Sequence, residues 1–223
     1  MTANDIVIVT KVHPRSYRDD ILRNAIASSQ QALYGTVNRS LDVVLLHAPH
    51  CWRGSCTQEE ESHHWQSAWH TLESLKKSGS ISAVGVSNFD TVLLQELLDM
   101  TDVKVAVVQN WMDPFNQDRA VRSLAAQHGI AYMSYSSFGT QWEWKLNYNP
   151  VFASSELNSI ASKHGKTIAQ VVISWVLQED CVVIPRSTKV LHMRNNLVHK
   201  PFLDKDDMVL IRSLDNSLGP LWD

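Results

Sequence analysis

The sequence predicts an α/β fold built on a parallel sheet. Short apolar runs rich in β-branched residues alternate along the 223-residue chain with segments that have the periodicity of amphipathic helices. The runs are apolar on both faces, which is typical of buried parallel strands. No linker or shift in composition interrupts this order, so we expect residues 1–223 to form a single domain.

Six strands are expected, at residues 6–10, 43–47, 83–87, 105–109, 131–135 and 182–185. The segments between them carry helical stripes of apolar side chains, at 21–33, 65–77, 92–98, 120–125 and 168–178. Thr167 is the expected N-cap of the last helix. A closed barrel of eight strand–helix units normally needs about 250 residues. The pattern alone therefore leaves two architectures open, a doubly wound open sheet and a barrel without some of its units.

Composition excludes several classes of protein. Hydrophobic residues make up 44% of the chain and charged residues 19%, which indicates a globular protein. The formal net charge of -3 gives no reason to expect nucleic acid or an anionic membrane as a partner, and no apolar run is long enough to span a bilayer. The N-terminus lacks the pattern of a signal peptide, and three cysteines do not indicate a disulfide framework. We therefore expect a reduced, cytoplasmic protein.

Polar residues stand where each expected strand ends. In parallel α/β folds the active site lies at the carboxyl ends of the strands, so these side chains should share one rim. They are Lys11, His47, Ser87 with Asn88, Gln109, Tyr135 with Ser136, and Arg186 with Ser187. Taken singly, each has a simpler interpretation: Lys11 as a solvated strand end, Ser87-Asn88 as a helix N-cap, Tyr135 as core.

Six motifs at these strand ends resemble the aldo-keto reductases in order and spacing. They are Ile-Val-Thr-Lys at 8–11, Leu-Leu-His-Ala-Pro at 45–49, Val-Gly-Val-Ser-Asn-Phe at 84–89, Val-Val-Gln-Asn at 107–110, Tyr-Ser-Ser-Phe-Gly at 135–139 and Val-Ile-Pro-Arg-Ser at 183–187. The resemblance covers nearly the whole chain. It implies a (β/α)₈ barrel of the TIM type that here lacks its first two strand–helix units. It also implies hydride transfer between NADPH and the carbonyl of an aldehyde or ketone.

The resemblance assigns roles to individual residues. Lys11 and His47 match catalytic positions. The cofactor positions are Ser87, Asn88 and Gln109 at the nicotinamide carboxamide, Tyr135 stacked on its ring, Ser136 and Phe138 along the pyrophosphate, Arg186 and Ser187 at the 2′-phosphate, and Asn196 at the adenine. The family often has an arginine where His192 stands, so NADP is the expected cofactor and NAD the alternative, with Arg194 as a substitute for that arginine. Ala48 follows His47 where many members have tryptophan, so Trp52 and Trp111 are expected to line the substrate site, helped by Trp142 and Trp144.

Two catalytic residues of the family, a proton-donating tyrosine and an aspartate, have no match in this sequence. Tyr17 is the nearest substitute for the tyrosine. The alternative function is therefore a catalytically impaired, reductase-like protein that binds cofactor without turnover. No metal is expected, although a cluster of histidines and cysteines leaves a zinc site as a minor alternative: His47, His50, Cys51, Cys56, His63 and His64. The expected partner is a small carbonyl compound. The chain is expected to be a monomer, with self-association through exposed strand edges as the alternative.

Overall fold

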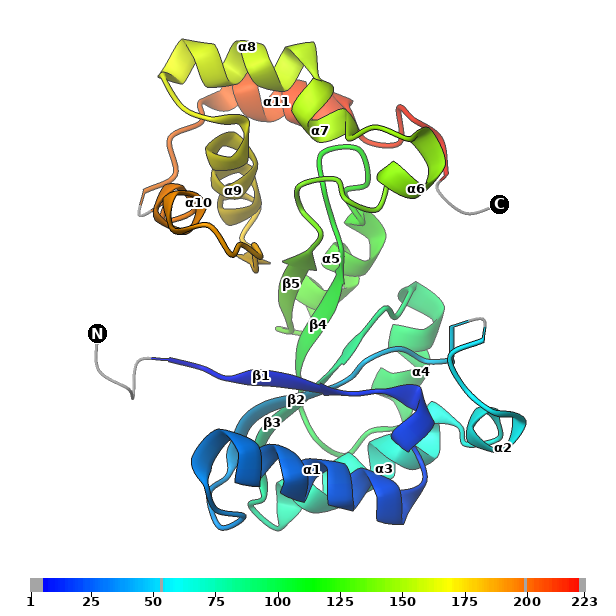
Figure 1. The fold of residues 1–223 in the computed structure, drawn as a ribbon. Helices are drawn as coiled ribbons and strands as arrows, with labels where there is room; N and C mark the ends of the chain where they lie inside the picture. The colour runs from blue at the N-terminus through cyan, green and yellow to red at the C-terminus, as the bar shows by residue number, and fades with distance from the viewer. Residues whose placement is uncertain (1–5, 53, 199, 221–223) are drawn as a thin grey trace. The chain divides into compact units, whose positions relative to one another are not determined.

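The structure is a computed structural model that describes residues 6–52, 54–198 and 200–220 (Figure 1). The chain divides into two compact units. The first unit contains the residues up to Gln109 together with Leu124–Ile130, and the second contains Asn110–Ser123 and the residues from Ala131 onward. Each unit combines parallel strands with helices, which confirms the predicted α/β class.

The sheet of the first unit has four parallel strands that lie side by side in chain order. They are β1 (Val9–Val12), β2 (Leu41–Leu46), β3 (Ile81–Ser87) and β4 (Val105–Trp111), whose last two residues belong to the second unit. The register pairs Lys11 with Leu45 and Ser87 with Gln109. All four carboxyl ends therefore point to the same edge of the sheet, and the polar strand-end residues lie along that edge.

Helices of the first unit pack against the sheet. They are α1 (Asp19–Tyr34), α2 (Gln58–Glu61), α3 (Trp65–Lys77), α4 (Thr91–Met100) and the end of α5 (Arg119–Gln127), preceded by the 3₁₀ turn Pro14–Ser16. Helices α1 and α3 lie together against one face of the strands (Figure 1). Leu22 and Ile26 of α1 and Trp69 and Leu72 of α3 are buried there. This burial explains the apolar stripes that predicted both helices.

The strands β3 and β4 approach each other unusually closely at Gly85, where the register shifts. A Cβ atom at this residue would lie 2.2 Å from the carbonyl oxygen of Val107 and 2.8 Å from a methyl group of Leu45. Real Cβ atoms are not found at such distances, so only glycine fits without movement of the backbone. The distance between β3 and β4, and hence between their carboxyl ends, depends on this residue.

The second unit consists of two short parallel strands and a group of helices. The strands are β5 (Ala131–Tyr135) and β6 (Val182–Val183). The helices are α6 (Glu143–Leu146), α7 (Pro150–Ala153), α8 (Ser155–His164), α9 (Ile168–Gln178), α10 (Val190–Asn195) and α11 (Lys205–Ser213). Every residue from Val171 to Val176 is buried, so α9 is the central helix of this unit. Thr167 is its N-cap, as predicted, and forms a capping box with Gln170.

Some predicted bounds were wrong in detail. β1 begins at Val9, later than predicted, and Ile6 and Val7 are exposed. β6 contains only two of the four expected residues. Exposed apolar side chains are concentrated from β6 through α10: Val182, Ile184, Val190, Leu191, Met193 and Leu197. Among the described residues, no helix combines the length and apolar character that crossing a membrane requires.

Candidate active site

Lys11 and His47 lie at the carboxyl ends of two adjacent strands. Lys11 belongs to β1, and His47 follows the last residue of β2, with its backbone N–H donating to the Val12 carbonyl. The Lys11 ammonium donates a hydrogen bond of 2.6 Å to the side-chain oxygen of Gln109, at the end of β4. Among the described residues, no carboxylate forms an ion pair with Lys11. A neutral amide therefore holds this cation at the rim.

Asn88 connects the ends of three strands. Its backbone lies in the left-handed region, with φ 60°, which asparagine adopts more readily than most residues. Its side-chain amide donates to the His47 carbonyl at 2.8 Å and to the Ser87 hydroxyl at 3.2 Å, and its backbone N–H donates to the Gln109 carbonyl. The interpretation of Ser87-Asn88 as a helix N-cap was wrong, because Asp90 caps α4.

The His47 imidazole is neutral at ordinary pH. Burial lowers its pKa to about 4, and the nearby positive charges of Lys11 and His13 contribute to the shift. Burial also lowers the pKa of Lys11 from its ordinary value. The two groups at this rim are thus a neutral imidazole and a cation whose proton is held less firmly than usual.

Two aromatic rings lie against His47. The Trp52 ring centroid is 4.9 Å from that of His47 and 5.1 Å from that of His13, and the His13 and His47 centroids are 6.0 Å apart. Trp52 was predicted to line the substrate site, and the structure places it beside His47. The sequence analysis missed His13, although it follows Lys11 by two residues and comes directly after the end of β1.

Tyr17 does not replace the missing proton donor. Its side chain is 1% exposed, and its hydroxyl donates to the Ala48 carbonyl. Burial raises the pKa of this phenol well above its ordinary value. The hydroxyl is used to hold the chain beside His47, so the expectation that Tyr17 could act as the acid was wrong.

Trp111 and Trp142, in the second unit, share one buried carboxylate. Both indole N–H groups donate to the same oxygen of Asp113, at 2.8 and 3.0 Å, and the rings meet edge to face. Burial raises the pKa of Asp113 to about 6, although four donors act against the shift. Trp142 is buried and therefore does not join a substrate wall, whereas Trp144 is 84% exposed. Asp113 fixes the orientation of Trp111, and no motif in the sequence indicated it.

The second unit brings together four of the residues assigned to the cofactor. Ser136, Phe138, Arg186 and Ser187 line one cavity of about 540 Å³, along with Thr140 and Thr188. Ser136 has φ 51°, which turns the chain sharply after β5. A guanidinium and several hydroxyl groups around one cavity fit a phosphate group.

Tyr135 and Asn196, two further residues assigned to the cofactor, belong to the second unit but do not line this cavity. Burial raises the pKa of Tyr135 to about 12. Asn196 is the C-cap of α10, and its backbone N–H donates to the His192 carbonyl. Their contacts with a cofactor stay predictions.

The cysteines behave differently from the expectation. Cys51 and Cys56 form a disulfide, and Cys181 is free and buried. Their separation of five residues and a Cα–Cα distance of 5.9 Å allow the bond. The expectation that the cysteines would be reduced was wrong for this pair. The zinc alternative loses two of its ligands, because bonded sulfurs are not thiolates.

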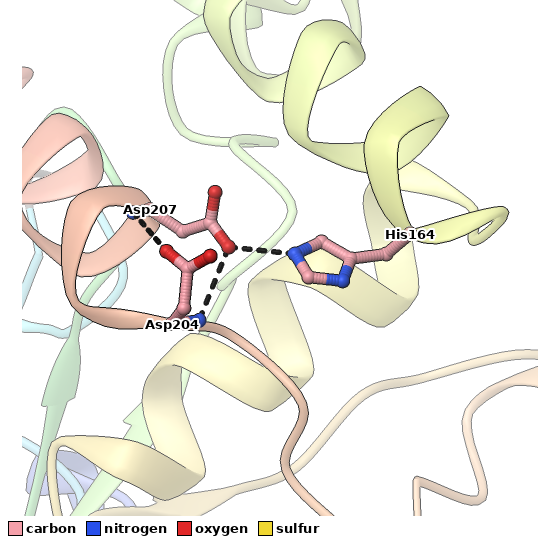
Figure 2. Close-up of side chains that lie close together, drawn as sticks. All are labelled: His164, Asp204 and Asp207. Carbon is pink, nitrogen blue, oxygen red and sulfur yellow. Dashed lines mark hydrogen bonds and ion pairs between the residues drawn. The ribbon is translucent and has the colours of Figure 1, made fainter.

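A different cluster, His164, Asp204 and Asp207, has the side-chain types of a metal site (Figure 2). Its oxygens already have partners. The Lys163 ammonium donates to Asp204 at 2.6 Å and to Asp207 at 2.8 Å, and the His164 ring lies 2.6 Å from the other Asp207 oxygen. The cluster therefore joins the end of α8 to the start of α11.

Comparison with known proteins agrees with this site. The profile of the Aldo/keto reductase family matches residues 2–216. An NAD(P)H-dependent D-xylose reductase of Scheffersomyces stipitis is 38% identical over 164 residues, which are 70% of this chain and 52% of that protein. A methylglyoxal reductase of Yersinia pestis is 33% identical over 198 residues, 86% of this chain and 66% of that protein.

Solved structures share the fold. One aldo-keto reductase complexed with NADPH matches with a TM-score of 0.84 and 26% identity, over 96% of this chain and 65% of its own. The fold and the strand-end residues define a parallel α/β protein of the TIM-barrel class, as predicted. The chain belongs to the aldo/keto reductase family. It spans about half the length of the curated xylose reductases it matches.

Proposed function

We propose that this chain reduces the carbonyl group of an aldehyde or ketone with NADPH. The observation that carries the proposal is the row of strand ends in the first unit, where Lys11, His47, Asn88 and Gln109 meet at one edge of the sheet. The relatives support it, because their names describe NAD(P)H-dependent reductases of sugars and a reductase of methylglyoxal. They do not favour the alternative of a protein that binds cofactor without turnover.

The residues present fit a nicotinamide dinucleotide. Ser87, Asn88 and Gln109 offer amide and hydroxyl groups for the carboxamide, and the cavity of the second unit offers Arg186 and Ser187 for a phosphate. When bound, NADPH supplies the hydride for the reaction. Arg186 supports NADPH over NADH, because a guanidinium binds a 2′-phosphate that NADH lacks.

The protein's own part in the reaction is to receive the carbonyl oxygen. The neutral His47 ring can donate one N–H to that oxygen and so orient the carbonyl. Lys11 supplies positive charge as the oxygen becomes alkoxide-like. Because burial lowers the Lys11 pKa, its ammonium is also the acid at this rim that gives up a proton more readily than an ordinary lysine.

The substrate in this proposal is a small carbonyl compound that lies against Trp52. Trp111 is the second residue that the family resemblance assigns to the substrate, and Asp113 fixes the orientation of its indole. No nucleic acid, membrane or metal takes part. The reaction takes place in the cytoplasm, and the working form is a monomer.

The test separates cofactor binding from turnover. NADPH fluorescence is titrated with the full chain, and initial rates are then measured with 4-nitrobenzaldehyde. We expect saturable binding and turnover that falls at least tenfold in His47→Ala but stays unchanged in His128→Ala, which alters an exposed histidine outside the site. Absence of NADPH binding would refute the whole proposal. Binding without turnover would refute the reaction and leave the cofactor site standing.

A further inference from the structure

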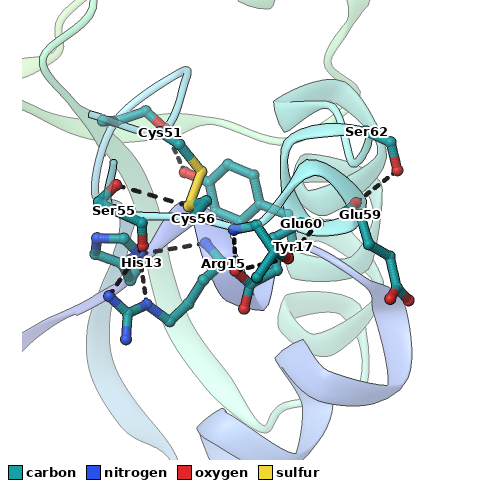
Figure 3. Close-up of a disulfide and its surroundings, with 11 residues drawn as sticks. His13, Arg15, Tyr17, Cys51, Ser55, Cys56, Glu59, Glu60 and Ser62 are labelled. Atoms are coloured by element: carbon teal, nitrogen blue, oxygen red, sulfur yellow. Dashed lines mark hydrogen bonds between the residues drawn. A yellow bond between two sulfur atoms is a disulfide. The ribbon is translucent and has the colours of Figure 1, made fainter. Parts of the chain in front are cut away.

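The loop between β2 and α2 is a closed ring beside the candidate site. The Cys51–Cys56 disulfide joins its two sides (Figure 3). The chain is anchored on both flanks of this ring. Before it, the Tyr17 hydroxyl binds the Ala48 carbonyl; after it, Thr57 and Glu60 form the capping box that starts α2. The disulfide is therefore a covalent constraint on the segment between these two anchored points.

Trp52 lies inside this ring and is the part of it that touches the site. Its side chain packs against both His47 and His13, yet 43% of it remains exposed. The Trp52 carbonyl accepts a hydrogen bond of 2.8 Å from the Ser55 N–H, within the disulfide loop. A half-exposed indole on a surface loop is normally free to change rotamer. Here the disulfide restricts the backbone that carries the indole, and the indole contacts His47 and His13.

Arg15 ties His13 to the same loop. Its guanidinium donates to the Ser55 carbonyl at 3.2 Å and to Nδ1 of His13 at 3.3 Å, and the Arg15 backbone N–H also donates to that nitrogen (Figure 3). With Nδ1 accepting, the proton of the neutral ring is on Nε2. His13 and Trp52 thus both lie next to His47, and both are connected to the disulfide loop, His13 through the Arg15 contact with Ser55 and Trp52 as the neighbour of Cys51.

We propose that the Cys51–Cys56 disulfide determines which carbonyl substrates this site accepts, by holding Trp52 against His47 and His13. The inference rests on the proposed carbonyl reduction. With the disulfide closed, the indole presents a fixed flat wall that favours planar aromatic aldehydes. Reduction opens the ring, Trp52 leaves His47, and the preference for aromatic over aliphatic aldehydes is lost.

The reductant is a dithiol. One of its thiolates attacks the sulfur of Cys51 or Cys56, breaks the S–S bond and forms a mixed disulfide, while the other cysteine leaves as a thiolate and takes a proton. The second thiol of the reductant then resolves the mixed disulfide. Two electrons and two protons pass to the protein in total. Cys51 and Cys56 become thiols and the dithiol becomes a disulfide.

The first test needs no turnover. The full chain is prepared oxidised, or reduced with dithiothreitol and desalted without oxygen, and is labelled with diethyl pyrocarbonate; modification of His47 is followed by mass spectrometry. We expect His47 to react at least fivefold faster in the reduced protein, because Trp52 no longer covers it. In the Cys51→Ser and Trp52→Ala variants, His47 should react at the fast rate in both preparations. Cys181→Ser, which removes the buried free cysteine, should keep the difference.

The second test concerns substrate choice. The ratio of kcat/KM for 4-nitrobenzaldehyde to that for butanal should fall at least fivefold on reduction, mainly through KM, and Cys51→Ser should show the low ratio throughout. Equal His47 labelling in the two preparations would overturn the inference, as would a ratio that reduction leaves unchanged. A protein that shows the labelling difference but turns over neither aldehyde would refute the proposed function and leave the disulfide's control of Trp52 intact.

Discussion

At the scale of single residues, the site is characterised by the group that accepts a hydrogen bond from the Lys11 ammonium. An ammonium usually pairs with a carboxylate, which raises its pKa. Here the acceptor is the neutral amide of Gln109, at 2.6 Å, and burial lowers the Lys11 pKa instead. The rim therefore combines a neutral imidazole at His47 with a lysine whose pKa burial lowers. The residue types were visible in the sequence, but their pairing across 98 positions was not.

Replacing Gln109 by glutamate should reverse the downward shift of the Lys11 pKa. The new carboxylate keeps the shape of the amide and adds a negative charge next to the ammonium, so the Lys11 pKa should rise. The measurement is the pH dependence of Lys11 acylation, followed by mass spectrometry. Gln95→Glu, on the exposed face of α4, is the matched control and should leave it unchanged. An identical Lys11 profile in Gln109→Glu and the parent protein would contradict the role given to this hydrogen bond.

His47 should make the protein less stable in mild acid. Its pKa is about 4 in the folded protein and 6.5 ordinarily, so between these values the unfolded chain binds a proton that the folded chain does not. The free energy of unfolding must therefore fall as the pH falls through this window. His47→Asn should lose part of this pH dependence, measured as the thermal unfolding midpoint from pH 7 to pH 5, while His128→Asn should keep it. Parallel curves for parent and His47→Asn would show that the imidazole titrates normally.

At the scale of elements, helices α8 and α11 are joined by ion pairs that the sequence pattern does not reveal. The end of α8 carries Lys163 and His164, and α11 begins with the capping box of Asp204 and Asp207. Basic groups suit a helix C-terminus and acidic groups suit an N-terminus. The sequence shows each preference separately. Only the fold shows that the two ends meet and neutralise each other.

Asp207→Asn should loosen this junction. Asp207 is 4% exposed and accepts from Lys163, His164 and its own N-cap, so losing its charge should lower the free energy of unfolding by about 2 kcal/mol at pH 7. These contacts lower the Asp207 pKa. The stabilisation is therefore present when the pH is above the ordinary pKa of an aspartate, and it is lost as the pH falls through the lowered pKa. Urea unfolding at pH 7 and pH 3 measures the loss of unfolding free energy and its dependence on pH. Asp206→Asn, on the exposed side of the same turn, should have little effect; equal losses in both variants would argue for a general charge effect.

At the scale of the whole molecule, the sequence predicted most of the architecture. Buried parallel strands are continuous apolar runs, so all six strands were found with ends within three residues of the prediction, and Thr167 marked the start of α9. Three features escaped. The Asp113 contacts with two indoles, the position of His13 and the disulfide all depend on distances between segments, which periodicity does not encode. β6 was overestimated because Ile184 is apolar yet exposed.

NADPH should stabilise the folded protein if the residues assigned to it act together. A ligand that binds the folded state and not the unfolded one should raise the unfolding midpoint. At a hundredfold excess over Kd the gain is about 2.7 kcal/mol. Arg186→Gln should reduce the gain from NADPH and leave that from NADH unchanged, whereas Arg39→Gln, an exposed arginine stacked on Tyr34, should change neither. The readout is thermal unfolding with each nucleotide, and equal gains in Arg186→Gln would remove this arginine from the 2′-phosphate.

The close approach of β3 and β4 at Gly85 limits which substitutions this position can accept. One additional methyl group would meet the Val107 carbonyl and push β4 away from β3, and Gln109 and Ser87 would move with their strands. A library that randomises β3 and is selected for folded protein should therefore return glycine at residue 85, while Ser82, exposed on the same strand, should accept many residues. A position to which no role in cofactor or substrate binding is assigned would then be among the least mutable in the chain, and recovery of alanine at residue 85 would show that the sheet can absorb the change.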